Sequence, residues 1–278
     1  MIHLDAQTLR LLQRTELELL QEADRIARRH DIPYCIIAGT MLGAVRHGGF
    51  IPWDDDADIA MLRPDYERFR EACRTELDPE KFYFQDHQVT PGYRWGYGKL
   101  RRSGTVFLRE HQEHMPYEQG VFIDVFPLDP VPASQLGRSL KNFECFLVRK
   151  LLWARVGKIA DRSAAKRVLY AALDHIPEER IKRYLDGMIA RAGRCESPWV
   201  RILCFPTPNR RYGYLARWYR GGEEVVFEGC RFPGVNGADE YLHFKFGDYR
   251  TLPPPEARKV HPVSQLRLPP PETLPGNN

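Results

Sequence analysis

Residues 36–61 of this 278-residue chain read IIAGTMLGAVRHGGFIPWDDDADIAM, and this stretch decides the fold. Its first three residues are apolar and typical of the end of a buried strand. Gly39-Thr40 then opens a turn, and residues 41–47 can form one or two helical turns. The acidic residues 54–58 lead directly into apolar Ile59-Ala60-Met61. We therefore expect two strands joined by a turn, with carboxylates at the start of the second strand.

Four aspartates lie within five residues of this stretch, and such a group repels itself unless a cation neutralises it. If residues 56–61 form a strand, Asp56 and Asp58 project from the same face. Two carboxylates on one face provide oxygen ligands that Mg²⁺ takes together with substrate phosphate. The alternative is a solvated acidic loop, which the strand-like apolar flanks disfavour. The Gly39-Thr40 turn favours the site, because its backbone N–H groups and hydroxyl can approach a phosphate.

A second acidic strand is predicted at residues 120–129, which read GVFIDVFPLD. Asp124 interrupts an apolar run, and a carboxylate in such a run is costly unless it is paired or metal-bound. Asp129 follows a proline and is interpreted as a structural turn residue.

These motifs resemble the LicD and fukutin-related phosphotransferase family of the nucleotidyltransferase-fold superfamily. Residues 39–58 fit its pattern G-T-x-L-G-x-x-R-H-x-G-F-I-P-W-D-D-D-x-D, and residues 123–129 fit its motif I-D-x-F-P-L-D. The resemblance covers roughly residues 25–130 and 222–262. It implies an α+β fold, in which a mixed sheet is flanked by helices and Asp124 lies on a strand beside the Asp-x-Asp strand.

The resemblance also implies the roles of the site residues. The catalytic residues are Asp56, Asp58 and Asp124, with Asp124 as general base. The same three carboxylates and Asp54 are the expected ligands of Mg²⁺, with Mn²⁺ as the alternative ion. Gly39, Thr40 and Arg46 are expected to hold donor phosphates. In the family-like C-terminal stretch, Asp248 and His261 are candidates at the edge of the site.

Residues 93–101 read YRWGYGKLR and add basic and aromatic side chains. Lys99 and Arg101 share one strand face, where they can hold a pyrophosphate; the alternative is a solvent-facing ladder. Trp53, Tyr93, Trp95 and Tyr97 are candidates for a cage around a quaternary ammonium, although aromatic residues at strand spacing are more often core.

Members of the family use CDP-linked alcohols, so the resemblance implies a specific reaction. An alcohol phosphate, most typically phosphocholine, moves from a CDP-alcohol donor to a hydroxyl of a cell-surface glycan or glycolipid precursor, and CMP leaves. One alternative is an NTP-dependent nucleotidyltransferase acting on a small molecule. Another is a non-catalytic glycan or membrane adaptor. Nucleic-acid binding is not expected, because no basic stripe is evident near the acidic centre.

The rest of the chain predicts a single catalytic domain over residues 1–262, with a helical region at about 133–193 and a proline-rich, disordered tail at 263–278. Residues 5–30 are expected to form a scaffold helix with Asp5 as its N-cap. Between Arg138 and Arg183 the chain has twelve Lys or Arg against five Asp or Glu. Such a basic region can contact an anionic membrane or glycan, or it is an ordinary solvated helical face.

Bulk composition is that of an ordinary globular protein, with 43% hydrophobic and 28% charged residues and a net charge of +4. The six cysteines form no CxxC pair, which favours reduced thiols. The N-terminal residues show no apolar leader, and no apolar run approaches the roughly 18 residues of a spanning helix. We therefore expect a cytoplasmic protein that makes at most peripheral contact with the inner face of the membrane.

Overall fold

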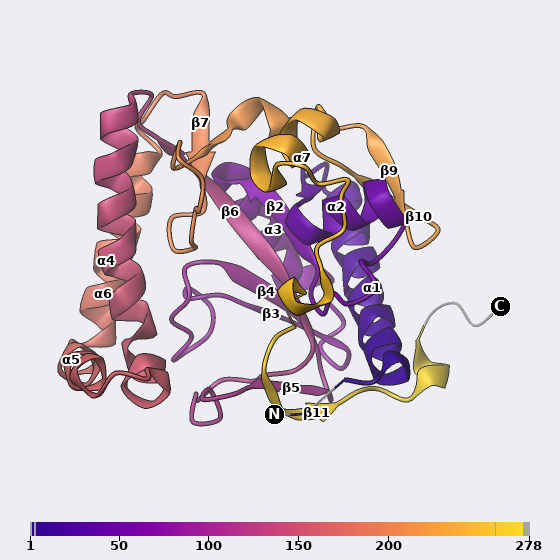
Figure 1. The fold of residues 1–278 in the computed structure, drawn as a ribbon, viewed down its shortest axis with the longest axis horizontal. Helices are drawn as coiled ribbons and strands as arrows, with labels where there is room; N and C mark the ends of the chain where they lie inside the picture. The colour runs from indigo at the N-terminus through magenta and orange to yellow at the C-terminus, as the bar shows by residue number, and fades with distance from the viewer. Residues whose placement is uncertain (1, 3, 259, 275–278) are drawn as a thin grey trace.

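The computed structural model describes residues 2, 4–258 and 260–274, and it has the expected α+β architecture (Figure 1). A mixed sheet lies at the centre, helices flank it, and a helical lobe follows the longest strand. The helices are α1 (Ala6–Arg29), α2 (Ala38–His47), α3 (Arg63–Glu76), α4 (Gln135–Ala160), α5 (Ala164–Asp174), α6 (Glu178–Ala192) and α7 (Ala238–Phe246). The strands are β1 (Cys35–Ile36), β2 (Asp58–Leu62), β3 (Phe82–Gln85), β4 (Gly98–Arg102), β5 (Val106–Arg109), β6 (Phe122–Val131), β7 (Trp199–Arg201), β8 (Tyr214–Leu215), β9 (Glu224–Phe227), β10 (Cys230–Pro233) and β11 (Val263–Arg267).

Strand β6 organises the main sheet, whose order is β1-β2-β6-β4-β3. Along one edge β6 pairs in parallel with β2, and along the other it pairs antiparallel with β4 and then with β7. Pro127 lies between the β4-paired and β7-paired segments, where a missing N–H is tolerated. Side chains alternate along the strand. Phe122, Asp124 and Phe126 therefore share one face, and Ile123 and Val125 share the other.

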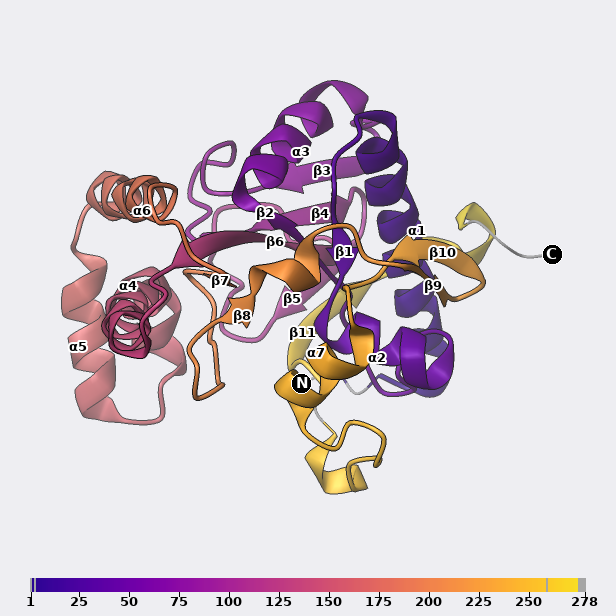
Figure 2. The same ribbon diagram turned by 90° about the horizontal axis from the view of Figure 1, so that it is seen from above.

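Helices α1 and α3 lie on one side of this sheet (Figure 2). Asp5 caps α1 by accepting a hydrogen bond from the Thr8 N–H, as the sequence predicted. Leu12, Leu19, Ala23 and Ile26 form the buried stripe of α1, and they join the same core as the β6 side chains. The main hydrophobic core therefore includes side chains from β6 and from the helix that packs on the sheet.

Helices α4, α5 and α6 form a separate lobe beyond the β7 end of the sheet, at the left edge of Figure 1. Ser134 begins α4 by accepting a hydrogen bond from the Gly137 N–H. The lobe has its own small core, in which Cys145, Val148 and Leu152 of α4 face Ile181 and Leu185 of α6. The expected helical middle region is confirmed.

The structure corrects two sequence predictions. Residues 263–278 were expected to be a disordered tail, but residues 263–267 form β11 and pair with β5, so the prediction is wrong there. Residues 275–278 lie outside the described residues. Asp129 is not in a turn. It lies within β6, fully buried, and accepts two hydrogen bonds from the Arg63 guanidinium.

All six cysteines are free. Within the described part of the chain, no helix has the length and apolar character that crossing a bilayer requires.

Candidate active site

The parallel pairing of β2 with β6 brings the predicted carboxylates together. Asp58 lies directly opposite Asp124 in this register, and Lys99 of β4 lies opposite Asp124 on its other side. The Asp124 N–H donates to the carbonyl of Ala57, 2.9 Å away, which fixes the start of the pairing. The prediction that Asp124 lies on a strand beside the Asp-x-Asp strand is confirmed. One sheet row therefore contains Asp58, Asp124 and Lys99.

The acidic residues before β2 are crowded and largely removed from water. Burial, followed by the charges of Asp56 and Asp55, raises the pKa of Asp54 to about 8. Burial is also the main cause of the raised pKa of Asp56. For Asp58, burial and then the neighbouring Asp56 and Asp124 carboxylates raise the pKa well above its usual range. These groups resist carrying their charges together, so the cluster attracts cations.

Lys99 supplies a cation at this point. Its ammonium forms an ion pair with Asp124 and lies 3.2 Å from the centre of the Phe122 ring. Burial lowers the pKa of Lys99 to about 7, against the attraction of Asp124. Lys245 of α7 opposes the rise in the pKa of Asp58 and donates a hydrogen bond to the Tyr214 hydroxyl, 3.4 Å away. Two lysines from distant elements thus partly balance the carboxylates.

His261 closes the cluster from the C-terminal side. Its backbone N–H donates to Asp55 Oδ2 at 2.7 Å, and its Nδ1 lies 3.1 Å from Asp55 Oδ1 and 3.8 Å from Asp56 Oδ2. This position depends on β11, because the Glu110 N–H donates to the Pro262 carbonyl and β11 begins at the next residue. Asp248, a second candidate from the C-terminal region, is exposed and accepts a hydrogen bond from Thr251 instead.

The predicted phosphate-binding residues of α2 are divided between its two ends. The Asp58 N–H donates to the Thr40 hydroxyl oxygen at 2.8 Å, which ties the first turn of α2 to β2. A Cβ atom at Gly39 would lie 2.7 Å from Asp54 Oδ2, so any larger residue here would displace the Asp54 carboxylate. Arg46 lies near the other end of α2 and donates to the Tyr249 carbonyl. The structure therefore brings Gly39 and Thr40, but not Arg46, to the carboxylates; their phosphate-binding roles stay predictions.

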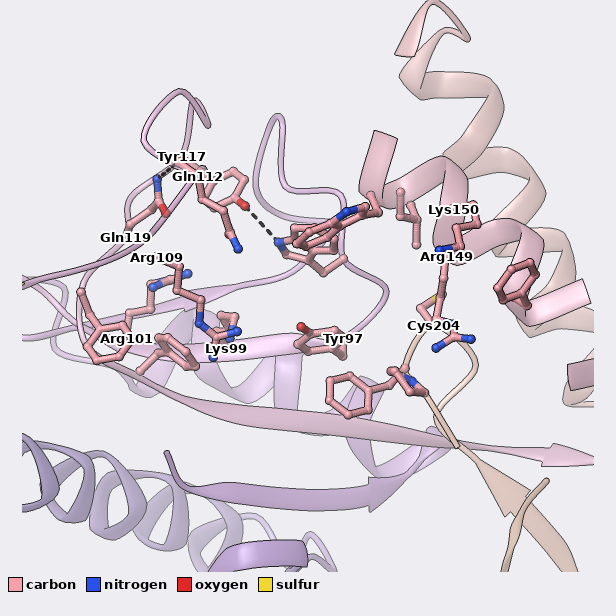
Figure 3. A pocket seen from close by; sticks show the side chains of 18 residues that line it. Tyr97, Lys99, Arg101, Arg109, Gln112, Tyr117, Gln119, Arg149, Lys150 and Cys204 are labelled. Carbon is pink, nitrogen blue, oxygen red and sulfur yellow. Dashed lines mark hydrogen bonds between the residues drawn. The ribbon is translucent and has the colours of Figure 1, made fainter. Parts of the chain in front are cut away.

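A cavity of about 460 Å³ opens beside this cluster, on the Asp124 face of the sheet (Figure 3). Lys99 and Arg101 both line it and are almost fully buried, so the solvent-facing ladder is excluded. Arg109 of β5 and Arg149 of α4 also line it, and neither Nε atom has a hydrogen-bond partner among the described residues. Buried donors without partners fit a ligand that carries acceptor oxygens. The five cations lining the cavity are Lys99, Arg101, Arg109, Arg149 and Lys150.

The sequence shows no basic stripe near the acidic centre, but the folded chain places five cations in the cavity beside it. They come from β4, β5 and α4, so only the folded chain gathers them. The expectation that the protein does not bind nucleic acid stays a prediction.

Aromatic side chains form much of the remaining cavity wall. Trp95 and Tyr97 line it, as do Tyr117 and Trp153. The Trp95 indole N–H donates to the Tyr117 hydroxyl at 2.9 Å, and the Trp95 and Trp153 ring centres are 5.8 Å apart. The other two cage candidates lie elsewhere. Tyr93 is fully buried, and Trp53 lies beneath the Arg258 guanidinium.

A divalent cation is compatible with the chemistry of this site. The donors are carboxylate oxygens, and their mutually raised pKa values indicate a deficit of positive charge. In the part of the chain that is described, however, no three His, Cys, Asp or Glu side chains converge as a ready-made metal site. The carboxylate oxygens are chemically suited to a divalent cation, but in this structure the described side chains do not converge on one metal position.

Sequence reasoning missed Glu16, although a signal was present. Glu16 lies within the apolar stripe of the first helix, four residues after Leu12 and three before Leu19. It is buried, and its Oε2 has no hydrogen-bond partner among the described residues. Burial, followed by Asp56 and Asp55, raises its pKa well above the usual range. The first helix is therefore more than scaffold, because Glu16 faces the acidic cluster.

Three further neighbours of the cluster were also missed. Gln13, one turn before Glu16, donates to the carbonyls of Ile51 and Asp54 and so anchors the acidic loop. Arg109 and Lys245 had no local signal, because nothing in their sequence neighbourhoods indicates which distant strand they face.

Comparison with known proteins agrees with this geometry. Residues 31–137, which include both acidic strands, match the family described as LicD/FKTN/FKRP, nucleotidyltransferase domain. The chain is 26% identical over 266 residues to a protein of Haemophilus influenzae named lipopolysaccharide cholinephosphotransferase LicD. That alignment covers 94% of this chain and 98% of the relative. A shorter match, 44% identical, covers 31% of this chain and 48% of an uncharacterised protein of Rickettsia prowazekii.

Proposed function

Because the chain belongs, through residues 31–137, to the LicD/FKTN/FKRP nucleotidyltransferase domain family, we propose that it transfers an alcohol phosphate from a CDP-alcohol to a glycan hydroxyl. The observation that carries this proposal is the row of Asp58, Asp124 and Lys99 beside a cavity with five cations. In phosphoryl transfer, carboxylates coordinate the metal ion and accept the proton of the attacking hydroxyl, and cations bind the phosphates. A binding adaptor needs no such concentration of buried acid.

We propose a CDP-alcohol donor with choline as the alcohol. The Haemophilus influenzae relative is named as a cholinephosphotransferase acting on lipopolysaccharide, and it aligns over nearly the full chain. The aromatic wall of Trp95, Tyr97, Tyr117 and Trp153 offers ring faces to a quaternary ammonium, worth about 0.5–2 kcal/mol for each favourable contact. The cations of the same cavity suit the diphosphate of the donor.

The residues act on the reaction in a defined order. Lys99, Arg101 and Arg109 hold the diphosphate in the cavity. The glycan hydroxyl attacks the phosphorus that carries the alcohol, and a new P–O bond forms. The bond from that phosphorus to the bridging oxygen breaks, and CMP leaves with the bridging oxygen. Asp124 accepts the proton of the attacking hydroxyl, after its ion pair with Lys99 has opened. Once this ion pair has opened, the Lys99 ammonium stays bound to the diphosphate.

Asp54, Asp56, Asp58 and Asp124 would hold Mg²⁺, or Mn²⁺ in its place. The ion would supply charge neutralisation for the diphosphate. Thr40 would act on this set indirectly, because its hydroxyl fixes the start of β2 and thereby the position of Asp58.

The reaction is tested by measuring CMP release from a panel of CDP-alcohols in the presence of Mg²⁺. Slow donor hydrolysis should occur even without the glycan. We expect CMP from one donor, CDP-choline, and its loss in Asp56→Asn. Asp248→Asn is the matched control, because this aspartate is exposed and distant from β2 and β6 in sequence. Pyrophosphate released from an NTP, with no CMP from any CDP-alcohol, would favour the nucleotidyltransferase instead.

The choice of alcohol has a separate test. Tyr97→Leu removes one ring from the cavity wall without removing a cation. If the ring contacts the ammonium, KM for CDP-choline should rise severalfold, while the inhibition constant of CDP-glycerol, measured as a competitive inhibitor, should change little. An equal change in both constants would exclude this contact.

A further inference from the structure

Helices α4 and α5 present an apolar surface that no described part of the chain covers. Leu136, Leu140, Phe143 and Leu147 recur at helical spacing along one side of α4, and the first three are 72%, 65% and 61% exposed. Ala154, seven residues after Leu147 on the same side of the helix, is fully buried in the region where α5 packs on α4. The stripe is therefore a packing face whose first half has no partner within the described chain.

Helix α5 continues this surface. Its only buried residue is Tyr170, while Val168 and Leu169 are 71% and 56% exposed. An ordinary surface helix turns such residues inward. Eight of the seventeen large apolar side chains that are exposed among the described residues lie on these two helices. Figures 1 and 2 place both helices at the same edge of the molecule. A concentration of this kind marks an interaction surface.

The excess positive charge around this surface indicates which kind of partner it can bind. Residues 135–174 contain nine Lys or Arg against three Asp or Glu. Two of the three acids are already paired within the lobe, Glu144 with Lys141 and Asp174 with Lys158. Arg162, Lys166 and Arg167 are exposed beside the apolar side chains of α5. A second copy of the chain would bring the same excess positive charge and be repelled, whereas an anionic lipid surface accepts both the charges and the apolar side chains.

The surface also adjoins the cavity. Phe146 and Lys150 of α4 line the cavity wall, and Phe146 is itself exposed at 41%. A bilayer against the α4 stripe would therefore lie next to this wall of the cavity. A glycan attached to a lipid in that bilayer would need to extend only a short way to reach the cations inside.

We propose that the exposed face of α4 and α5 docks on an anionic lipid bilayer and presents the cavity to a lipid-linked acceptor. The exposed surface by itself supports the docking, whereas the role of a lipid-linked acceptor rests on the proposed phosphotransfer.

Vesicle flotation of the full chain tests the docking. We expect wild-type protein to float with phosphatidylglycerol-containing vesicles, to float poorly with phosphatidylcholine alone, and to be released by high salt. The double variant Leu140→Glu/Phe143→Glu should lose at least roughly tenfold in partitioning, because charges then face the acyl chains. Val226→Glu is the matched control, since Val226 is similarly exposed but lies on β9. Arg162→Gln/Lys166→Gln should weaken binding by about fivefold for each charge removed.

CMP release from soluble donor is measured on the same proteins and separates the two proposals. Leu140 and Phe143 do not line the cavity, so the double variant should hydrolyse donor at the wild-type rate. Wild-type protein that releases CMP but ignores anionic vesicles would overturn the docking and leave the phosphotransfer intact. Vesicle binding that the double variant retains would also overturn it. So would a wild-type dimer that this variant converts to monomer, because the surface would then be a contact between copies.

Discussion

Strand β6 carries two buried aspartates, five residues apart, in opposite electrostatic situations. Asp129 accepts hydrogen bonds from Arg63 Nε at 2.8 Å and Nη2 at 2.6 Å, so a rigid guanidinium neutralises it fully. Asp124 lies between Asp58 and Lys99, near other carboxylates whose pKa values are raised. A balanced buried charge is a structural feature, whereas a buried cluster of like charges persists only where a cation or substrate uses it. Asp129 thus contributes to the stability of the fold, and Asp124 contributes to the chemistry of the site.

The largest effect is expected from metal removal, which acts only on the Asp124 end. A chelator should reduce CMP release by about three orders of magnitude or more, because the carboxylates then repel the donor diphosphate. Added Mg²⁺ should restore the rate, and the unfolding midpoint should fall little with the chelator. CMP release that is insensitive to chelation would show that Lys99 and the arginines suffice for the diphosphate.

The next effect concerns stability at the other end of β6. Asp129→Asn should lower the free energy of unfolding by about 3–5 kcal/mol, because it leaves the buried Arg63 guanidinium without a counter-charge. Urea unfolding monitored by circular dichroism measures this difference. The double variant Arg63→Met/Asp129→Leu is the control, and it should recover much of the loss by replacing the pair with apolar side chains. A single variant as stable as wild type would contradict a structural role for this pair.

A smaller, pH-dependent effect is expected at Glu16. Its pKa in the folded state is raised well above 4.5, mainly by burial, so the native state binds this proton more tightly than the unfolded state. Wild-type stability should therefore fall as pH rises above about 4.5, by at most about 1.4 kcal/mol per pH unit. Glu16→Gln has no proton to lose there. Its stability relative to wild type should increase with pH, and a difference that is constant between pH 4 and 7 would contradict this account.

Much of the fold follows from local pattern. The apolar runs around Asp58 and Asp124 predicted two strands, whereas their pairing in the site was implied by the family resemblance. The first helix, its Asp5 cap and the helical middle region also follow from periodicity and capping. These features depend on neighbours within a few residues, which is the range over which a single sequence is informative.

Features that depend on distant parts of the chain could not be predicted in this way. His261 was expected at the edge of the site, but its contact with Asp55 depends on the pairing of β11 with β5, and the prolines around residues 263–267 concealed that strand. Arg63 and Asp129 are 66 residues apart, so the proline before Asp129 was interpreted as a turn signal. Glu16 differs from these, because its place in the apolar stripe of the first helix was visible in the sequence and indicated a buried carboxyl group.

The measurement that tests the central claim most directly compares Asp124→Asn with Asp129→Asn. CMP release from CDP-choline is measured for both at a temperature where circular dichroism shows both folded. We predict that Asp124→Asn loses about 10²–10⁴-fold in kcat while its unfolding midpoint falls less than that of Asp129→Asn. Asp129→Asn should keep the wild-type kcat per folded molecule and unfold earlier. A fully active Asp124→Asn would contradict the account, because the chemistry would then lie away from the carboxylate row.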